Sequence, residues 1–207
     1  MKYSFFRISK TRKKPRHIVG QKLPLKLDQI WAIRVRLELQ NKLRDLSLFN
    51  MAIDSMLRSC DLVKLSMRDI YSGDELVSRA QVIQKKTGQP VQFEITKRTK
   101  LAVQNWVNCA HLSLDDYLFR SRDRNSNHIS TRQYARIVDQ WVTSIGLDKA
   151  LYGTHSLRRT KASIIYRESK NIRAVQILLG HTKIESTVRY LGVEVDDALE
   201  LAERIDI

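Results

Sequence analysis

The stretch Thr154-His155-Ser156-Leu157-Arg158-Arg159-Thr160 places one imidazole beside a pair of guanidinium groups. If a helix begins near Ser156, His155 and Arg158 are three positions apart and can face the same pocket. Each residue alone also fits an ordinary role. A single histidine is most often a surface or satisfied core residue, and in so basic a chain the arginine pair can be a solvated face or a phosphate clamp. The interpretation therefore depends on the residues that follow.

Two further groups follow this stretch. The run Leu178-Leu179-Gly180-His181 is typical of a helix that a glycine ends, with an imidazole just beyond the cap. Tyr190 comes nine positions after His181, which leaves room for a second short helix that returns its hydroxyl to the pocket. Tyr190 can also be interpreted as a half-buried aromatic residue. Together these groups offer cations for an anion and a phenol that can attack it.

These residues resemble the three C-terminal motifs of the tyrosine recombinases, the phage integrase family. Upstream, the segment from Met56 to Leu62 resembles the first arginine motif of that family, in which an acid follows Arg58 after three positions. Lys86-Thr87-Gly88 resembles the hairpin turn in which the family places its catalytic lysine. Each motif is short, but all of them in the expected order make a specific combination.

The resemblance covers the chain from about Leu25 to Ile207. It implies the fold of a tyrosine recombinase catalytic domain and a site-specific DNA recombinase or integrase of a mobile element. Such an enzyme breaks and rejoins DNA strands through a 3′-phosphotyrosyl intermediate, with no cofactor, metal or ATP. The catalytic residues that the resemblance implies are Arg58, Lys86, His155, Arg158, His181 and the nucleophile Tyr190.

The roles that the resemblance implies agree with elementary chemistry. Two fixed arginines stabilise charge on the non-bridging phosphate oxygens without having to reorganise. A lysine held near the departing 5′ oxygen can protonate it. The family implies His155 as the acid/base partner of Tyr190, and His181 as a hydrogen-bond donor to the phosphate. A phosphotyrosyl ester retains the energy of the broken phosphodiester, so rejoining needs no ATP.

The composition favours a nucleic-acid partner. The chain has 207 residues, of which 43% are hydrophobic, and its formal net charge is +15. Such a charge favours a polyanion, and double-stranded DNA is the expected partner, with a membrane surface as the competitor. No apolar run approaches the ~20 residues that cross a bilayer. Cys60 and Cys109 lack metal-type spacing. The sequence therefore predicts a cytoplasmic, nucleoid-associated protein with reduced thiols and no metal site.

Positive charge is concentrated at the N-terminus, because residues 1–27 hold nine lysines or arginines and no acid. With Pro15 breaking any helix, residues 1–24 are predicted to form a flexible basic arm before a catalytic domain over residues 25–207. The arm is either a solvated tail or a non-specific phosphate contact. The predicted DNA-binding residues are Lys10, Arg12, Lys13, Lys14 and Arg16 of the arm, Arg120, Arg122 and Arg124 of a polar loop, and Arg159. Larger family members carry a separate core-binding domain, which is not expected here, so the chain is either a compact recombinase or a fragment.

The remaining pattern predicts an α+β fold that is mainly α-helical with a small antiparallel hairpin. Apolar residues at three- and four-residue steps predict two core helices between Leu27 and Leu57, with Arg58 at the end of the second. Leu76–Gln84 and Val91–Ile95 predict the hairpin, with room for one extra strand before it. Further helices are predicted over Thr96–Ala110 and in the segment that Ser130 caps.

The segment from Val195 to Ile205 predicts an amphipathic helix that needs an apolar partner. The resemblance implies that this helix docks on a neighbouring subunit and links a homo-tetramer on DNA. Folding back onto its own domain is the alternative. The apolar stripe is small, so we expect a monomer or weak oligomer in solution and a tetramer on DNA.

Two other classes of protein fit parts of the sequence. A non-catalytic DNA-binding regulator with the recombinase fold would carry the same positive charge, but it would have no need of a tyrosine aligned with two arginines, two histidines and a lysine. An RNA-binding protein would stack bases on aromatic residues of a sheet face. The predicted strands supply only Phe93 for that purpose, so this class ranks last.

Overall fold

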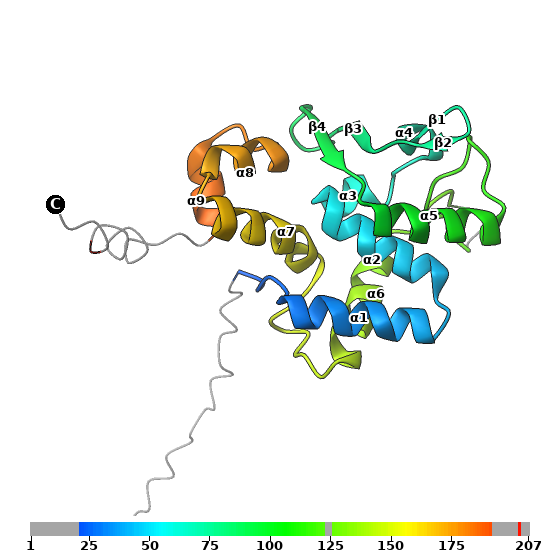
Figure 1. Cartoon of the computed structure of the whole chain (residues 1–207), viewed down its shortest axis with the longest axis horizontal. Coiled ribbons are helices and arrows are strands. Elements are labelled where there is room, and N and C mark those ends of the chain that lie inside the picture. Colours follow the sequence, from blue (N-terminus) through cyan, green and yellow to red (C-terminus); the bar gives the residue numbers. More distant parts are fainter. Residues whose placement is uncertain (1–20, 123–125, 192–202, 204–207) are drawn as a thin grey trace, which may run out of the picture.

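The computed structural model describes residues 21–122, 126–191 and 203. Within these residues the fold is mainly α-helical with two short antiparallel β ladders, which confirms the predicted class (Figure 1). The elements in chain order are α1 Leu27–Leu39, α2 Leu43–Ser55, α3 Ser59–Leu62, α4 Met67–Ile70, β1 Tyr71–Ser72, β2 Glu75–Leu76, β3 Arg79–Ile83, β4 Pro90–Glu94, α5 Lys97–Ala110, α6 Thr131–Ser144, α7 Thr154–Ser169, α8 Ile172–Leu179 and α9 Ile184–Leu191.

Helix α2 is the buried centre of this fold. All its residues from Leu46 to Ser55 are buried, and α1, α5, α7 and strand β4 pack around it (Figure 1). Phe49 of α2 also meets Trp141 of α6 edge to face, with ring centroids 5.4 Å apart. A helix enclosed in this way must be apolar on most of its circumference. Its last turn therefore gives a rigid support for the segment that carries Arg58.

Strands β3 and β4 form the predicted hairpin. They pair antiparallel from Arg79 opposite Glu94 to Ile83 opposite Pro90, and the turn between them carries Lys86. Gly88 in this turn has a φ of +65°, a conformation that glycine adopts without steric cost. The extra strand that the sequence allowed is a separate ladder, in which β1 pairs with β2 alone.

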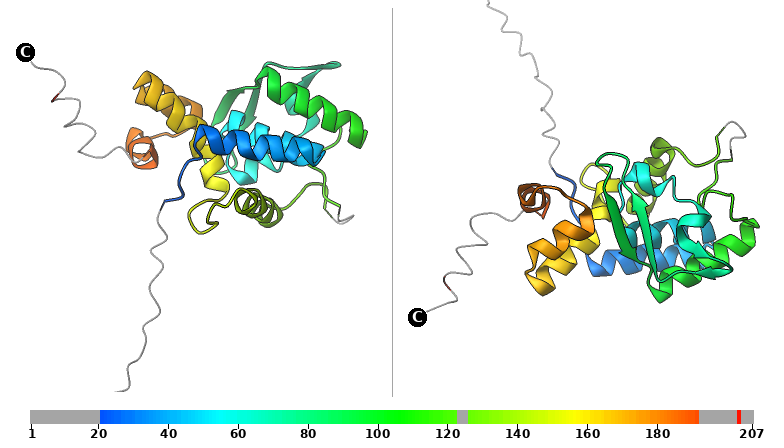
Figure 2. Two further views of the ribbon diagram at one scale, coloured as in Figure 1. Left: turned by 60° about the horizontal axis from the view of Figure 1, so that its bottom comes forward. Right: turned by 90° about the horizontal axis from the view of Figure 1, so that it is seen from above.

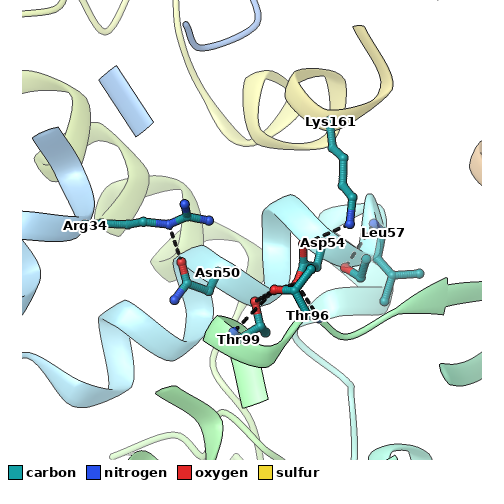
Figure 3. Close-up of polar contacts among 8 residues, drawn as sticks. Arg34, Asn50, Asp54, Leu57, Thr96, Thr99 and Lys161 are labelled. Atoms are coloured by element: carbon teal, nitrogen blue, oxygen red, sulfur yellow. Dashed lines mark hydrogen bonds and ion pairs between the residues drawn. The ribbon is translucent and has the colours of Figure 1, made fainter. Parts of the chain in front are cut away.

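A buried polar cluster ties α2 to α5 and α7 (Figure 3). One carboxylate oxygen of Asp54 lies 2.9 Å from Nζ of Lys161. The other oxygen accepts hydrogen bonds from the backbone N–H and hydroxyl of Thr96 and from the hydroxyl of Thr99. Burial alone would raise the pKa of Asp54, but Lys161 and these donors together lower it. The ionised carboxylate thus fixes α2, which ends shortly before Arg58, against α7, which carries Arg158.

Helices α7, α8 and α9 form one end of the molecule, beyond the hairpin (Figure 2). A small second core of Met56, Ala162, Val175 and Leu179 holds this end to the rest of the fold. Gly180 ends α8 with a φ of +63°, as the sequence predicted. A Cβ atom at this position would lie 2.4 Å from Cγ2 of Val91. Glycine is therefore required both by the backbone conformation and by the close approach of the hairpin.

Two boundaries differ from the predictions. Arg58 is not at the end of α2, because Met56 turns the chain with a left-handed backbone and Arg58 becomes the N-cap of α3. The predicted arm of residues 1–24 also meets the folded domain earlier than residue 25. The side-chain amide of Gln21 donates to the backbone oxygen of Arg189, and the backbone N–H of Leu23 donates to the backbone oxygen of Leu151.

Several predictions fall outside the described residues. These are the basic residues Lys10, Arg12, Lys13, Lys14 and Arg16, the loop residue Arg124, and the helix predicted from Val195 to Ile205. In the part that the structure does describe, no helix is long and apolar enough to cross a membrane. The same part contains no group of three or more histidine, cysteine or acidic residues placed to hold a metal ion.

Candidate active site

A cavity of about 420 Å³ lies where α7, the α8–α9 junction and the β3–β4 turn meet. All the side chains that the resemblance marks as catalytic line it, although they come from parts of the chain far apart in sequence. These residues are Arg58, Lys86, His155, Arg158, His181 and Tyr190. The fold thus brings together a phenol, two imidazoles and three cationic side chains around one space.

The guanidinium group of Arg158 is fixed by backbone carbonyls. Its Nη1 donates to the oxygen of Met56 at 2.5 Å, and its Nη2 donates to the oxygen of Leu179 at 2.8 Å. The residue is only 3% exposed. Burial lowers the pKa of Arg158, but the usual value of an arginine is so high that the group stays charged. A preorganised cation therefore faces the cavity.

Arg58 is held by the hairpin. Its Nη1 donates to the side-chain oxygen of Gln84, and the hydroxyl of Thr87 donates to the same oxygen at 3.1 Å. The amide nitrogen of Gln84 donates to the oxygen of Leu179 at 3.1 Å. Within residues 21–122 and 126–191, no carboxylate forms an ion pair with Arg58. An anion that enters the cavity would supply the missing counter-charge.

Lys86 lines the cavity from the exposed hairpin turn. Lys85 precedes it in the same turn. The backbone N–H of Lys85 donates to the carboxylate of Asp61, and Lys85 is not among the residues that line the cavity. The geometry therefore favours Lys86 as the lysine that can reach a bound group.

The hydroxyl of Tyr190 is buried and makes no hydrogen bond of normal geometry, although Arg158 is close enough to stabilise its ionised form by charge and hydrogen bonding. Burial raises the pKa of Tyr190 to about 12, although the charges of Arg158 and Arg159 act in the opposite direction. The guanidinium carbons of these arginines lie 5.9 and 5.4 Å from the centroid of its ring. The phenol is thus neutral at neutral pH and needs both a base and nearby cations to act as a nucleophile.

The two histidines differ in their surroundings. His181 lies edge-on to the ring of Tyr190, with centroids 5.4 Å apart, and its Nδ1 is 3.1 Å from the hydroxyl oxygen of Thr187. Burial, followed by the charges of Arg158 and Arg58, lowers the pKa of His181 to about 4. His155 exposes much of its side chain at the rim of the cavity. Partial desolvation of its ring and the surrounding cations also lower the pKa of His155, so both imidazoles are neutral at neutral pH.

Arg159 occupies a different place from the one expected of a DNA-binding residue. It is only 6% exposed, and its Nη1 donates to the backbone oxygen of Lys22 at 2.8 Å. Because the guanidinium group is enclosed between Lys22 and the ring of Tyr190, it is not available to a phosphate at the surface in this conformation. The structure thus places Arg159 beside the nucleophile candidate, and its predicted contact with DNA stays a prediction.

Arg120 and Arg122 lie away from this cavity. Both line an open groove of about 820 Å³, which contains none of the residues predicted to be catalytic. Arg120 is partly engaged, since it donates to the carboxylate of Asp116 and to the backbone oxygen of Ala110. Other basic side chains of the groove are Lys42, Arg44 and Arg136. The larger space is thus a cationic surface, and the smaller one holds the residues predicted to be catalytic.

Sequence reasoning missed two residues that hold the site. Gln84 is fully buried and joins Arg58 to the end of α8, and Thr187 is fully buried against His181. The polar residue Gln84 directly follows the apolar pair Val82-Ile83, and Thr187 lies three positions before Tyr190 on a short helix. These positions in the sequence are the only local indication of their role. They predict which face of a strand or helix a side chain lies on, but not which residue it contacts.

Comparison with known proteins gives the same family as the motifs. The model of the phage integrase family matches residues 25–196. The probable integrase/recombinase YoeC of Bacillus subtilis is 31% identical over 174 residues, which cover 82% of this chain and 88% of that protein. The tyrosine recombinase XerC of Thermodesulfovibrio yellowstonii is 28% identical over 164 residues, covering 78% of this chain. The chain spans 54% of the length of that XerC, about half.

Solved structures with the same fold are also recombinases. The crystal structure of XerA recombinase matches with a TM-score of 0.71 at 19% identity, covering 89% of this chain and 65% of that one. The pre-cleavage complex of the XerH site-specific recombinase with its difH substrate matches with a TM-score of 0.69 at 17% identity, covering 88% of this chain and 54% of that one. At these identities the similarity concerns the fold. With the family match over most of the chain and the relative of 31% identity, it follows that this chain belongs to the phage integrase family, the tyrosine recombinases.

Proposed function

We propose that this chain breaks and rejoins DNA strands at specific sites, with Tyr190 as the nucleophile that forms a 3′-phosphotyrosyl link. The observation that carries the proposal is the single cavity that Tyr190 shares with Arg58, Arg158 and Lys86. A phosphodiester is the anion that this set fits. Two guanidinium groups match its non-bridging oxygens, and a phenol stands where an attacking oxygen is needed.

The proposed reaction is a transesterification in which the number of phosphoester bonds is conserved. The hydroxyl oxygen of Tyr190 attacks the phosphorus while the bond from phosphorus to the 5′ oxygen breaks. The phenolic proton passes to His155, whose lowered pKa leaves it neutral and able to accept. Lys86 protonates the departing 5′ oxygen. The reverse reaction, with a 5′ hydroxyl as nucleophile, rejoins the strand without ATP.

Charge stabilisation is the main contribution that we assign to the arginines. The negative charge of the phosphoryl group grows toward the transition state, and the guanidinium groups are already held by Met56, Leu179 and Gln84. They need no reorganisation, which is the condition under which fixed donors lower a barrier most.

The proposed partner is double-stranded DNA. The net charge of +15 and the cationic groove that Arg120 and Arg122 line support this partner. The neighbour XerH was solved bound to its difH substrate. We include in the proposal a basic arm over residues 1–24, a monomer or weak oligomer in solution, a homo-tetramer on DNA, and a cytoplasmic, nucleoid-associated location.

A non-catalytic regulator with the same fold is the competing function, and covalent trapping separates the two. Full-length protein is incubated with nicked duplexes that tile the DNA flanking its coding sequence. When the enzyme cleaves close to the nick, the short released fragment that carries the 5′ hydroxyl diffuses away. Without this hydroxyl the covalent intermediate cannot be resealed. A recombinase gives a protein–DNA adduct that survives denaturation, and Tyr190→Phe gives none. A regulator binds the duplexes and gives no adduct with either protein.

A further inference from the structure

We infer that Thr187 is a positioning residue that fixes the ring tautomer of His181, with the proton on Nε2 and that N–H available to the cavity. The inference rests on the proposed function, because it concerns the side chain that would donate a hydrogen bond to the phosphate. It adds a residue to the proposed machinery and states which nitrogen of His181 acts.

The backbone of His181 is fixed from both directions. Its N–H donates to the backbone oxygen of Gln176 at 3.1 Å, and its oxygen accepts from the side-chain amide of Gln176 at 2.9 Å. That amide is itself held, because its oxygen accepts from Arg173 at 2.8 Å. Gly180, just before the ring, is also packed closely against Val91. Only the orientation and the tautomer of the ring remain to be set.

Helix α9 sets the orientation. Thr187 and Tyr190 are three positions apart on this helix and therefore share a face. The hydroxyl of Thr187 lies 3.1 Å from Nδ1 of His181, and the ring of Tyr190 lies edge-on to the imidazole. Among the described residues, Nε2 of His181 has no hydrogen-bond partner, and the side chain lines the cavity. One nitrogen thus faces the protein and the other is left for a ligand.

The direction of the hydrogen bond follows from the fate of the hydroxyl proton. Serine and threonine within a helix commonly donate to the carbonyl four positions earlier. Thr160 does so to Ser156, and Ser169 does so to Ile165. Thr187 makes no such bond, and within residues 21–122 and 126–191 its hydroxyl has Nδ1 of His181 as its one partner. A fully buried hydroxyl proton without an acceptor is unfavourable, so Thr187 donates and Nδ1 accepts.

An accepting Nδ1 determines the state of the whole ring. A neutral imidazole carries one proton, so Nε2 must hold it and becomes a donor. Protonating both nitrogens would turn Nδ1 into a donor and leave the hydroxyl proton of Thr187 with no acceptor. Thr187 therefore favours the neutral ring, in the same direction as the nearby Arg158 and Arg58. The cavity gains an uncharged donor beside its fixed cations.

The tautomer can be measured directly on the full-length protein. Nitrogen-15 labelling of histidine, followed by long-range proton–nitrogen correlation spectra, distinguishes Nδ1–H, Nε2–H and doubly protonated rings. The signals of His181 are identified by their loss in His181→Asn. We expect Nε2–H in the wild type and in Thr187→Ser, and a mixture of tautomers in Thr187→Val. A wild-type ring protonated on Nδ1 at neutral pH overturns the inference.

Cleavage of the nicked duplexes supplies the second readout. Single-turnover cleavage should survive in Thr187→Ser and fall about 10- to 100-fold in Thr187→Val, as when partners that orient metal-bound histidines are removed. Thr143→Val, on α6, is the control for the same substitution. A folded Thr187→Val that keeps both tautomer and rate overturns the inference. If it does not fold, the wild-type and Thr187→Ser spectra still decide. Wild-type protein with the Nε2–H ring but no cleavage would sink the proposed function and leave the tautomer assignment standing.

Discussion

The side-chain oxygen of Gln84 accepts a hydrogen bond from Arg58, although the two residues are 26 positions apart in the sequence. The amide of the same side chain donates to the backbone oxygen of Leu179, which also accepts from Arg158. One buried glutamine and one carbonyl thus connect the two arginines of the cavity. The position of Gln84 therefore affects both cations through these contacts.

Replacing Gln84 with methionine keeps its length and removes its three side-chain hydrogen bonds, to Arg58, Thr87 and Leu179. We expect single-turnover cleavage to fall about 10- to 100-fold, because Arg58 loses its support. The free energy of unfolding should fall by about 1–3 kcal/mol, because buried hydrogen-bonding partners are left unsatisfied. Gln81→Met, on the exposed face of β3, the strand that ends just before Gln84, is the matched control. Equal cleavage rates in the two variants would show that Arg58 does not depend on Gln84.

Arg58 and Arg158 should contribute more to the rate of cleavage than Arg159. Arg58→Ala and Arg158→Lys are expected to slow single-turnover cleavage by about 10²–10³-fold each, as when a transition-state donor is removed. Arg159→Lys should slow it less, because its guanidinium group is bonded to the backbone of Lys22. If Arg159→Lys proves the most damaging at equal protein stability, the phosphate contact has been assigned to the wrong guanidinium group.

The pair Asp54–Lys161 should matter for stability far more than a surface pair. Lys161→Met leaves the buried carboxylate of Asp54 without its cation, and we expect a loss of about 3 kcal/mol. Glu94→Gln breaks the exposed pair with Arg79, where both side chains are more than half exposed, and should cost under about 1 kcal/mol. Urea unfolding of both variants gives the comparison. A Lys161→Met protein as stable as Glu94→Gln contradicts the clamp between α2 and α7.

His181 should make stability depend on pH. Its pKa is about 4 in the folded protein against an ordinary value of 6.5, so the unfolded chain binds a proton first as pH falls. The contribution of the neutral ring to stability is complete at pH values above the ordinary pKa. It is lost as pH falls from the ordinary pKa to the pKa of the folded protein, and it changes no further at lower pH. Urea midpoints measured across this interval should fall more steeply for wild type than for His181→Asn. Parallel curves would mean that His181 is not held neutral.

The sequence predicted the elements well where the local signal is strong. Ser130 caps α6 and Gly180 ends α8, as expected, because caps and left-handed glycines depend on a few adjacent residues. The predicted position of Arg58, at the end of the second helix, was less accurate. The left-handed turn at Met56, a residue without that preference, follows from packing against α7 and α8 rather than from local sequence. Tertiary context overrides propensity in such places.

The six candidate site residues could be identified from motifs, but their supports could not. Gln84 meets Arg58 from 26 positions away, and no short pattern encodes such a partner. Thr187 and Gln176 lie only six and five positions from His181, but side-chain geometry rather than sequence spacing decides that they bond to it. The burial of Arg159 could not be predicted either, because the segment around Lys22 that covers it is 137 positions away in the sequence. Burial of a charged side chain depends on which distant segment packs over it.

Tyr190 is proposed to be the residue that becomes linked to DNA. Wild-type protein trapped on nicked duplex is digested with nuclease and protease, and the peptide that carries the residual nucleotide is sequenced by mass spectrometry. We expect the modification on the phenolic oxygen of Tyr190, joined to a 3′ phosphate, and its absence in Tyr190→Phe. A nucleotide attached to any other residue, or an adduct that forms equally well in Tyr190→Phe, would contradict the account.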